Sequence, residues 1–220
     1  MQTKAVIFDM DGVLVDSEAI ICDAAIRMFA ELGITAQPDD FIPFIGAGED
    51  RYIGGVAEKY GIPYNPTTMK TRTYAIYLEL ISAGIDPFPG VAEFVRACRE
   101  SGRKIAVASS ADMIKVEANL HAIQLPPSEF DVVFSAEKVE HKKPAPDIFL
   151  AAAKALGVDP SHCLVVEDAV NGVQAAKSAG MVCIAVAQSF EAADLEAAGA
   201  DLVRSGTGAI KLEDLEAVRL

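Results

Sequence analysis

The chain of 220 residues lacks a long uninterrupted apolar segment, although 51% of its residues are hydrophobic. No run approaches the roughly 20 apolar residues that a membrane-spanning helix needs. The first residues also lack the basic segment, apolar core and small-residue cleavage pattern of an export signal. We therefore expect a soluble, cytoplasmic protein without a membrane partner. Its length suits one large domain, or a core plus a smaller domain.

Basic residues are scarce: 19 Lys and Arg stand against 32 Asp and Glu, which gives a formal net charge of −13. The longest basic run is the pair Lys142 and Lys143. Because nucleic acids are bound through basic surfaces, we expect no nucleic-acid partner. An acidic chain also repels small anions, so any phosphate site must be made locally positive by a metal ion, a lysine or helix N-termini.

Cysteine is also rare, and no CxxC pair occurs. The four cysteines stand singly inside apolar stretches; they are Cys22, Cys98, Cys163 and Cys183. This spacing argues against a disulfide or zinc framework. We expect buried, reduced thiols.

Apolar strand patterns alternate with amphipathic helix patterns over most of the chain. Strands are predicted at residues 4–9, 104–109, 131–135, 163–168, 182–187 and 201–203. Helices are predicted at residues 91–101, 112–121, 146–156, 171–179, 191–198 and 212–218. Near-continuous apolar strands with intervening helices are typical of a parallel sheet covered on both faces. The sequence therefore predicts a doubly wound, Rossmann-like α/β core.

Residues 16–87 interrupt this alternation, because they show helical patterns and no alternating strand. A helix is predicted at 16–32, with Asp16 or Ser17 as N-cap and Gly33 just after its end. Shorter helical patterns follow at 39–44, 49–60 and 66–83, and a proline-rich linker at 86–90 leads back. We expect an α/β core of residues 1–15 and 88–220 with an all-helical insertion at 16–87.

Polar residues collect where the predicted strands end. The first strand ends at Asp9 and Asp11, and Gly12 lets the backbone leave the strand there. Other strand ends and one loop carry Ser109 with Ser110, Glu167 with Asp168, and Lys143. The carboxyl ends of parallel strands share one edge of a sheet, where such folds bind ligands. We therefore expect one cleft with clustered carboxylates, which suits Mg²⁺ and phosphoryl chemistry.

Each of these features has a structural alternative when it stands alone. The serines at 109 and 110 suit a helix cap, the lysines at 142 and 143 a solvated loop, and the acids at 167 and 168 a helix N-terminus. Their joint placement after successive strands favours a catalytic site. There one carboxylate can attack phosphorus while a second moves a proton to the leaving group and from water.

Four segments resemble, in order and spacing, the four motifs of the haloacid dehalogenase superfamily. They are residues 9–13 (Asp-Met-Asp-Gly-Val), 107–110 (Val-Ala-Ser-Ser), 143–147 (Lys-Pro-Ala-Pro-Asp) and 165–168 (Val-Val-Glu-Asp). The resemblance covers nearly the whole chain, and it implies that the insertion is a cap closing over the first motif. It also implies that the cofactor is Mg²⁺.

The resemblance implies a role for each matching residue. Asp9 would be the nucleophile, and Asp11 the general acid and base. Asp9, Asp11 through its carbonyl, Glu167 and Asp168 would hold Mg²⁺. The phosphoryl group would be bound by Gly12, Ser109, Ser110, Ala111 and Lys143. An aspartate at position 11 also implies attack on phosphorus rather than on carbon.

The chain looks most similar to the β-phosphoglucomutase-like phosphatases. It departs from the mutases at two cap positions, with Ile21 in place of a histidine and Glu49 in place of a phosphate-binding arginine. Gly46, Glu49 and Arg51 are candidate specificity residues, and Arg51 is a candidate substitute for that arginine. We favour a monomeric phosphatase of a small phosphorylated metabolite; a hexose-phosphate mutase and an inactive phosphate-binding module are the alternatives.

Overall fold

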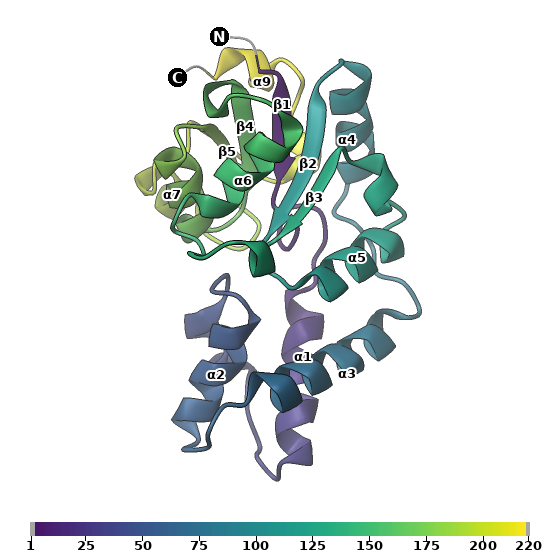
Figure 1. Cartoon of the computed structure of the whole chain (residues 1–220), viewed down its shortest axis with the longest axis vertical. Helices are drawn as coiled ribbons and strands as arrows, with labels where there is room; N and C mark the ends of the chain where they lie inside the picture. The colour runs from purple at the N-terminus through teal and green to yellow at the C-terminus, as the bar shows by residue number, and fades with distance from the viewer. Residues whose placement is uncertain (1–2, 219–220) are drawn as a thin grey trace.

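A six-stranded sheet forms the centre of the computed structural model, which describes residues 3–218 (Figure 1). The strand order is β3-β2-β1-β4-β5-β6, and every neighbouring pair is parallel. The strands are β1 (Ala5–Phe8), β2 (Lys104–Ser109), β3 (Val132–Ser135), β4 (Cys163–Glu167), β5 (Val182–Val186) and β6 (Leu202–Arg204). The predicted parallel α/β sheet is confirmed, and β1 lies at its middle.

Helices cover both faces of the sheet because successive side chains of the buried strands point in opposite directions. Val6 and Phe8 pack in one apolar cluster with α4 (Val91–Glu100), α5 (Met113–Ala122) and α9 (Asp214–Ala217). Ala5 and Ile7 pack in a second cluster with α6 (Asp147–Leu156), α7 (Val170–Ser178) and α8 (Ala192–Ala197). The fold is therefore doubly wound.

Three further helices lie between β1 and β2 in the chain and gather at one end of the molecule (Figure 1). They are α1 (Glu18–Glu31), α2 (Glu49–Lys59) and α3 (Thr71–Ile81). Short turns of helix join these three helices or lie next to β-strands in the chain, at Pro38–Asp40, Ile42–Phe44, Pro66–Lys70, Pro127–Glu129, Ala136–Lys138, Pro160–His162 and Thr207–Ala209. The three helices share a hydrophobic cluster that includes Phe29, Phe41 and Tyr77. We call them the cap.

Two chain segments connect the cap to the sheet, and they run side by side. Val15 forms an antiparallel bridge with Pro87, and the N–H of Phe88 donates to the carbonyl of Leu14 at 3.1 Å. This pairing lies next to residues 16 and 87, the limits expected for the insertion. These domain limits stay a prediction.

The thiols of all four cysteines are free, and three of them are buried. Within residues 3–218, no helix has the length and apolar character required to cross a membrane.

Candidate active site

The first loop of the site is a tight turn after β1. Gly12 has a positive φ of 75°, which is costly for any residue with a side chain. A Cβ atom at this position would lie 1.9 Å from Oδ2 of Asp168. The glycine therefore lets the turn lie directly against the carboxylate that follows β4.

Three carboxylates meet beside this turn. Asp9, Glu167 and Asp168 are buried, and each offers an oxygen within 4.8 Å of the others. The Nζ atom of Lys143 lies 2.5 Å from Oδ1 of Asp9 and 2.5 Å from Oε1 of Glu167. The ammonium group also lies 4.8 Å from the ring centre of Phe149. The strand ends and the lysine loop are thus brought together in one cluster, which we call the acidic cluster.

Glu167 also fixes the backbone that follows β4. Its Oε2 accepts hydrogen bonds from the N–H groups of Asp168 and Ala169, both at 2.8 Å. Its other oxygen contacts Lys143, so both oxygens of the carboxylate have partners. Glu167 therefore accepts hydrogen bonds from the backbone just before α7 and also belongs to the acidic cluster. Asp168 lines the pocket.

Burial sets the electrostatics of this cluster. It raises the pKa of Asp9 to about 7, against the opposing attraction of Lys143 and with the help of Glu167. Burial, together with the charges of Glu167 and Asp9, raises the pKa of Asp168 well above its usual range. For Lys143, burial lowers the pKa, but Asp9 and Glu167 raise it more, so the lysine stays charged.

The donor set of the acidic cluster fits a hard divalent cation. The acidic cluster holds three carboxylates and one lysine, which contacts two of them, and the available ligands are oxygens of the kind that Mg²⁺ binds. Such crowding is costly without a cation.

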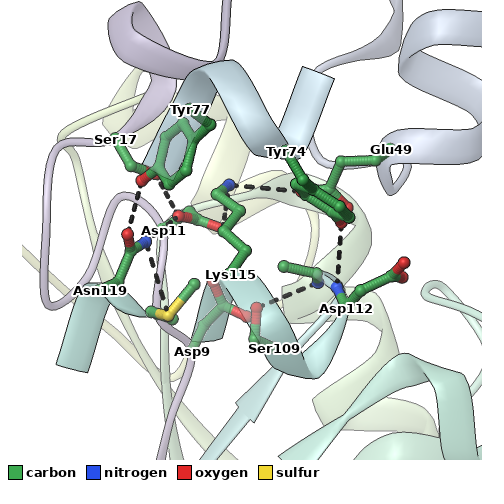
Figure 2. A network of polar contacts seen from close by, with 12 residues as sticks. Asp9, Asp11, Ser17, Glu49, Tyr74, Tyr77, Ser109, Asp112, Lys115 and Asn119 are labelled. Atoms are coloured by element: carbon green, nitrogen blue, oxygen red, sulfur yellow. Dashed lines mark hydrogen bonds and ion pairs between the residues drawn. The ribbon is translucent and has the colours of Figure 1, made fainter. Parts of the chain in front are cut away.

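The carboxylate of Asp11 is held by three side chains outside the acidic cluster (Figure 2). Its Oδ1 accepts hydrogen bonds from the hydroxyl of Ser17 and, at 3.4 Å, from the amide of Asn119. Its Oδ2 lies 3.0 Å from Nζ of Lys115. Ser17 does stand at the N-cap position of α1, but its side chain makes no capping hydrogen bond and contacts Asp11 instead.

Lys115 is a site residue that the sequence reasoning missed. It lies on α5, and its side chain is only 3% exposed. Its ammonium group lies between Asp11 of the core and Glu49 of the cap, 3.4 Å from Oε1 of Glu49 (Figure 2). Burial lowers the pKa of Lys115, but the charges of Asp11 and Glu49 raise it more. Lys115 therefore stays charged and joins the two halves of the site.

A pocket of about 150 Å³ lies between the acidic cluster and the cap. Ten predicted residues line it: Asp9, Asp11, Gly12, Gly46, Glu49, Ser110, Ala111, Lys143, Glu167 and Asp168. Residues not predicted for the site also line it, among them Glu18, Tyr52, Lys115 and Asn171. Ile21, the position compared with a mutase histidine, is part of the wall as well.

Two of the predicted site residues, Ser109 and Arg51, do not line the pocket. Ser109 is buried behind the pocket wall, where its hydroxyl oxygen accepts the N–H of Ala111 at 3.1 Å. The guanidinium of Arg51 lies 4.9 Å from the ring centre of Phe44 and 3.4 Å from the carboxylate of Glu58. Arg51 is thus exposed and does not reach the pocket.

Polar contacts hold the cap against the core around the pocket. The amide of Asn171 donates to the carbonyl of Gly46 at 2.9 Å. Lys70, directly before cap helix α3, lies 2.8 Å from Asp112, directly before α5. Together with the contact between Lys115 and Glu49, these interactions describe a cap that is closed over the acidic cluster.

Comparisons with known proteins identify the family of the chain. A family model described as haloacid dehalogenase-like hydrolase matches residues 3–180. The chain is 48% identical over 218 residues to SUPPRESSOR OF QUENCHING 1 of Arabidopsis thaliana, covering 97% of the chain but only 21% of that protein. The chain thus spans about a fifth of this relative. It is 35% identical over 189 residues to hexitol phosphatase B of Escherichia coli, covering 84% of each.

Solved structures share the whole fold. A mutant of CbbY from Rhodobacter sphaeroides, in complex with xylulose-1,5-bisphosphate, superposes with a TM-score of 0.87 at 26% identity and covers 100% of both chains. A β-phosphoglucomutase from Clostridium difficile gives a TM-score of 0.86 at 25% identity, covering 98% of this chain and 96% of its own. These matches support the predicted phosphatase, with a mutase as the second choice. The chain belongs to the haloacid dehalogenase-like hydrolases.

Proposed function

We propose that the chain is a Mg²⁺-dependent phosphatase of a small phosphorylated metabolite, such as a sugar phosphate, and that it works through an aspartyl-phosphate intermediate. One observation carries the proposal. Asp9 is buried and lines the pocket in contact with a lysine that neutralises part of its charge, and a second aspartate, Asp11, lines the same pocket.

The first half-reaction assigns a role to each of these residues. The carboxylate of Asp9 attacks phosphorus, the bond from phosphorus to the ester oxygen breaks, and Asp11 gives a proton to the departing oxygen. Lys143 and the backbone N–H group at Ser110 balance charge on the phosphoryl oxygens, next to Ala111, whose own N–H already donates to Ser109.

The second half-reaction restores the enzyme. Asp11 takes a proton from a water molecule as that water attacks phosphorus, and the bond between phosphorus and Asp9 breaks. Inorganic phosphate leaves, and both aspartates return to their starting state. Closure of the cap limits the water that can enter and so protects the intermediate.

Asp9, Asp168 and the carbonyl of Asp11 would hold the Mg²⁺ ion, with Glu167 beside them. When bound, the ion supplies positive charge that balances the carboxylates and the phosphoryl oxygens. The crowding of three carboxylates in the acidic cluster, which helps to raise the pKa of Asp168, supports this assignment.

The similar proteins support the substrate class. Hexitol phosphatase B is named for a phosphorylated sugar alcohol, and CbbY was crystallised with a sugar bisphosphate. A small phosphorylated metabolite of this kind suits the pocket of about 150 Å³, which is far too small for a macromolecule.

A hexose-phosphate mutase is the second candidate, favoured by the likeness to β-phosphoglucomutase. Ile21 and Glu49 in the pocket wall speak against it, because neither side chain can bind a second phosphate group. Incubating a hexose 1-phosphate with and without a bisphosphate activator separates the two activities. Free phosphate in excess of isomerised sugar phosphate supports the phosphatase.

The main test measures phosphate release from a metabolite panel with Mg²⁺. We expect release by the wild type and none by Asp9→Asn. Asp23→Asn is a matched control, because Asp23 is a half-exposed partner of Arg27 on α1 and should not affect turnover. Wild-type protein that releases phosphate from no compound would refute the proposal.

The cytoplasmic location and the monomeric state stay predictions. Size-exclusion chromatography can test the monomeric state.

A further inference from the structure

The pocket has a second end, opposite the acidic cluster, which the proposed chemistry does not use. Four of the residues that line this end are Glu18 of α1, Glu49 and Tyr52 of α2, and Lys115 of α5. Three of these four residues come from the cap. Because phosphorus must lie near Asp9 and Lys143, this second end faces the alcohol part of the substrate, which departs as the leaving group.

Glu49 is built into this wall in an unusual way. The residue is only 6% exposed, and one of its oxygens lies 3.4 Å from Nζ of Lys115. Its other oxygen, Oε2, is buried and has no hydrogen-bond partner among the described residues. A buried carboxylate oxygen without a partner is costly, so its presence in a pocket wall indicates an acceptor that a ligand satisfies.

Glu18, on cap helix α1, also has a buried carboxylate oxygen, Oε1, that makes no hydrogen bond within residues 3–218. The hydroxyl of Tyr52 nevertheless lies beside this carboxylate. Burial raises the pKa of Glu18 to about 7, against the attraction of Lys115, and burial also raises the pKa of Glu49. Two carboxylates from two helices therefore line one pocket, and each has a buried oxygen without a hydrogen bond among the described residues.

The charge of Lys115 does not turn this wall into an anion site. Its ammonium group already contacts Asp11 and Glu49, so one positive charge is shared by two carboxylates, with Glu18 nearby. A second phosphate or a carboxylate on the leaving group would meet this excess of negative charge at short range. Hydroxyl groups, in contrast, could donate to the free oxygens.

We propose that Glu49 and Glu18 form a subsite for the leaving group that selects uncharged, hydroxyl-bearing alcohols and rejects a second anionic group. The inference rests on the proposed phosphatase function and narrows its substrates to monophosphates of neutral polyols or sugars. It sets this chain apart from CbbY, whose complex holds a bisphosphate.

A matched pair of substrates tests the subsite. Sorbitol 6-phosphate and 6-phosphogluconate share a six-carbon chain and differ at C1, where the first carries CH₂OH and the second a carboxylate. We expect kcat/KM of the wild type to favour sorbitol 6-phosphate by about tenfold or more, since a like charge enters a desolvated wall. Fructose 1,6-bisphosphate should be at least as poor as 6-phosphogluconate.

Variants show whether Glu49 carries this selectivity. Glu49→Gln keeps the shape and one acceptor oxygen but removes the charge, so the preference for sorbitol 6-phosphate over 6-phosphogluconate should shrink several-fold. Glu18→Gln should also reduce this preference, and it replaces Glu49→Gln as the test variant if Glu49→Gln does not fold. Glu58→Gln is the control, because Glu58 lies on the same helix α2 with an exposed side chain and should leave the preference unchanged.

The outcomes separate the subsite from the catalytic proposal. p-Nitrophenyl phosphate, added as a generic substrate, reports phosphatase activity alone. If the wild type releases phosphate from no substrate, the proposed function fails, and the subsite with it. If it is active but prefers 6-phosphogluconate or the bisphosphate, or if neither glutamate variant alters the preference, the subsite is refuted and the phosphatase stands.

Discussion

Replacing the proposed nucleophile should stabilise the metal-free protein while it abolishes turnover. Asp9→Asn keeps nearly the same shape, and its side-chain oxygen can still accept a hydrogen bond from Lys143. The change removes one of three buried carboxylates, and Lys143 keeps Glu167 as its ionic partner. Crowded charge in the acidic cluster is thus exchanged for a neutral amide.

The pKa of Asp9 gives the size and the sign of this effect. The carboxyl has a pKa near 3.8 when unfolded and about 7 when folded, so the folded chain keeps a proton that the unfolded chain releases. The stability of the wild type therefore falls as the pH rises from about 4 to about 7, and this loss is complete above pH 7. At 1.36 kcal/mol per pKa unit, the loss has an upper limit of about 4 kcal/mol.

The net gain from Asp9→Asn is smaller than this limit, because the variant also gives up the attraction between Asp9 and Lys143. We expect the metal-free variant to be more stable than the wild type by about 1 to 3 kcal/mol at pH 8 and by much less at pH 5. Urea unfolding followed by circular dichroism, in EDTA, measures both differences. Equal stability at pH 8, or a difference that does not change with pH, would contradict the reasoning.

Three further predictions follow from the same contacts. Lys115→Met leaves the buried Glu49 and the partly buried Asp11 without their shared cation. Stability should therefore fall by about 3 kcal/mol and kcat by about tenfold or more, which urea unfolding and p-nitrophenyl phosphate turnover can measure. Lys154→Met, on an exposed face of α6, is the control. Gly12→Ala should abolish activity because its Cβ would overlap Asp168, whereas Gly33→Ala, also at positive φ but with no atom within 4 Å, should cost about 1 kcal/mol of stability and no activity. EDTA should stop phosphate release and Mg²⁺ should restore it, with Mg²⁺ raising the melting temperature of the wild type more than that of Asp9→Asn.

The sheet and the acidic cluster could be predicted because their signals are local. Apolar runs indicate buried strands, and a parallel sheet places the ends of those strands on one edge. Asp9, Lys143 and Asp168 could therefore be assigned to one site from their positions after strands or in one loop. In the structure β1 lies between β2 and β4, so Asp9 after β1 lies close to Asp168 after β4, and Lys143 contacts Asp9.

The second end of the pocket could not be predicted in the same way. Lys115 and Asn119 lie four residues apart on α5, beside the buried Val116 and Leu120, and this spacing alone indicates two polar residues on the inner face of a helix. Their partner Asp11 lies more than 100 residues earlier in the chain. Pairing across such a separation depends on how the cap packs on the core, which helical periodicity does not define.

Charge explains why an acidic protein can still hold a phosphate ester. The sequence requires a locally positive site, and two buried lysines supply part of it. However, Lys143 contacts two carboxylates, and Lys115 is shared between Asp11 and Glu49. Neither lysine therefore leaves a net positive charge for the substrate. A dianionic phosphoryl group placed against Asp9 would therefore be repelled by the protein alone. The proposed function therefore calls for a divalent cation at the acidic cluster, and the proposed subsite confines the negative charge of the substrate to the phosphoryl end of the pocket.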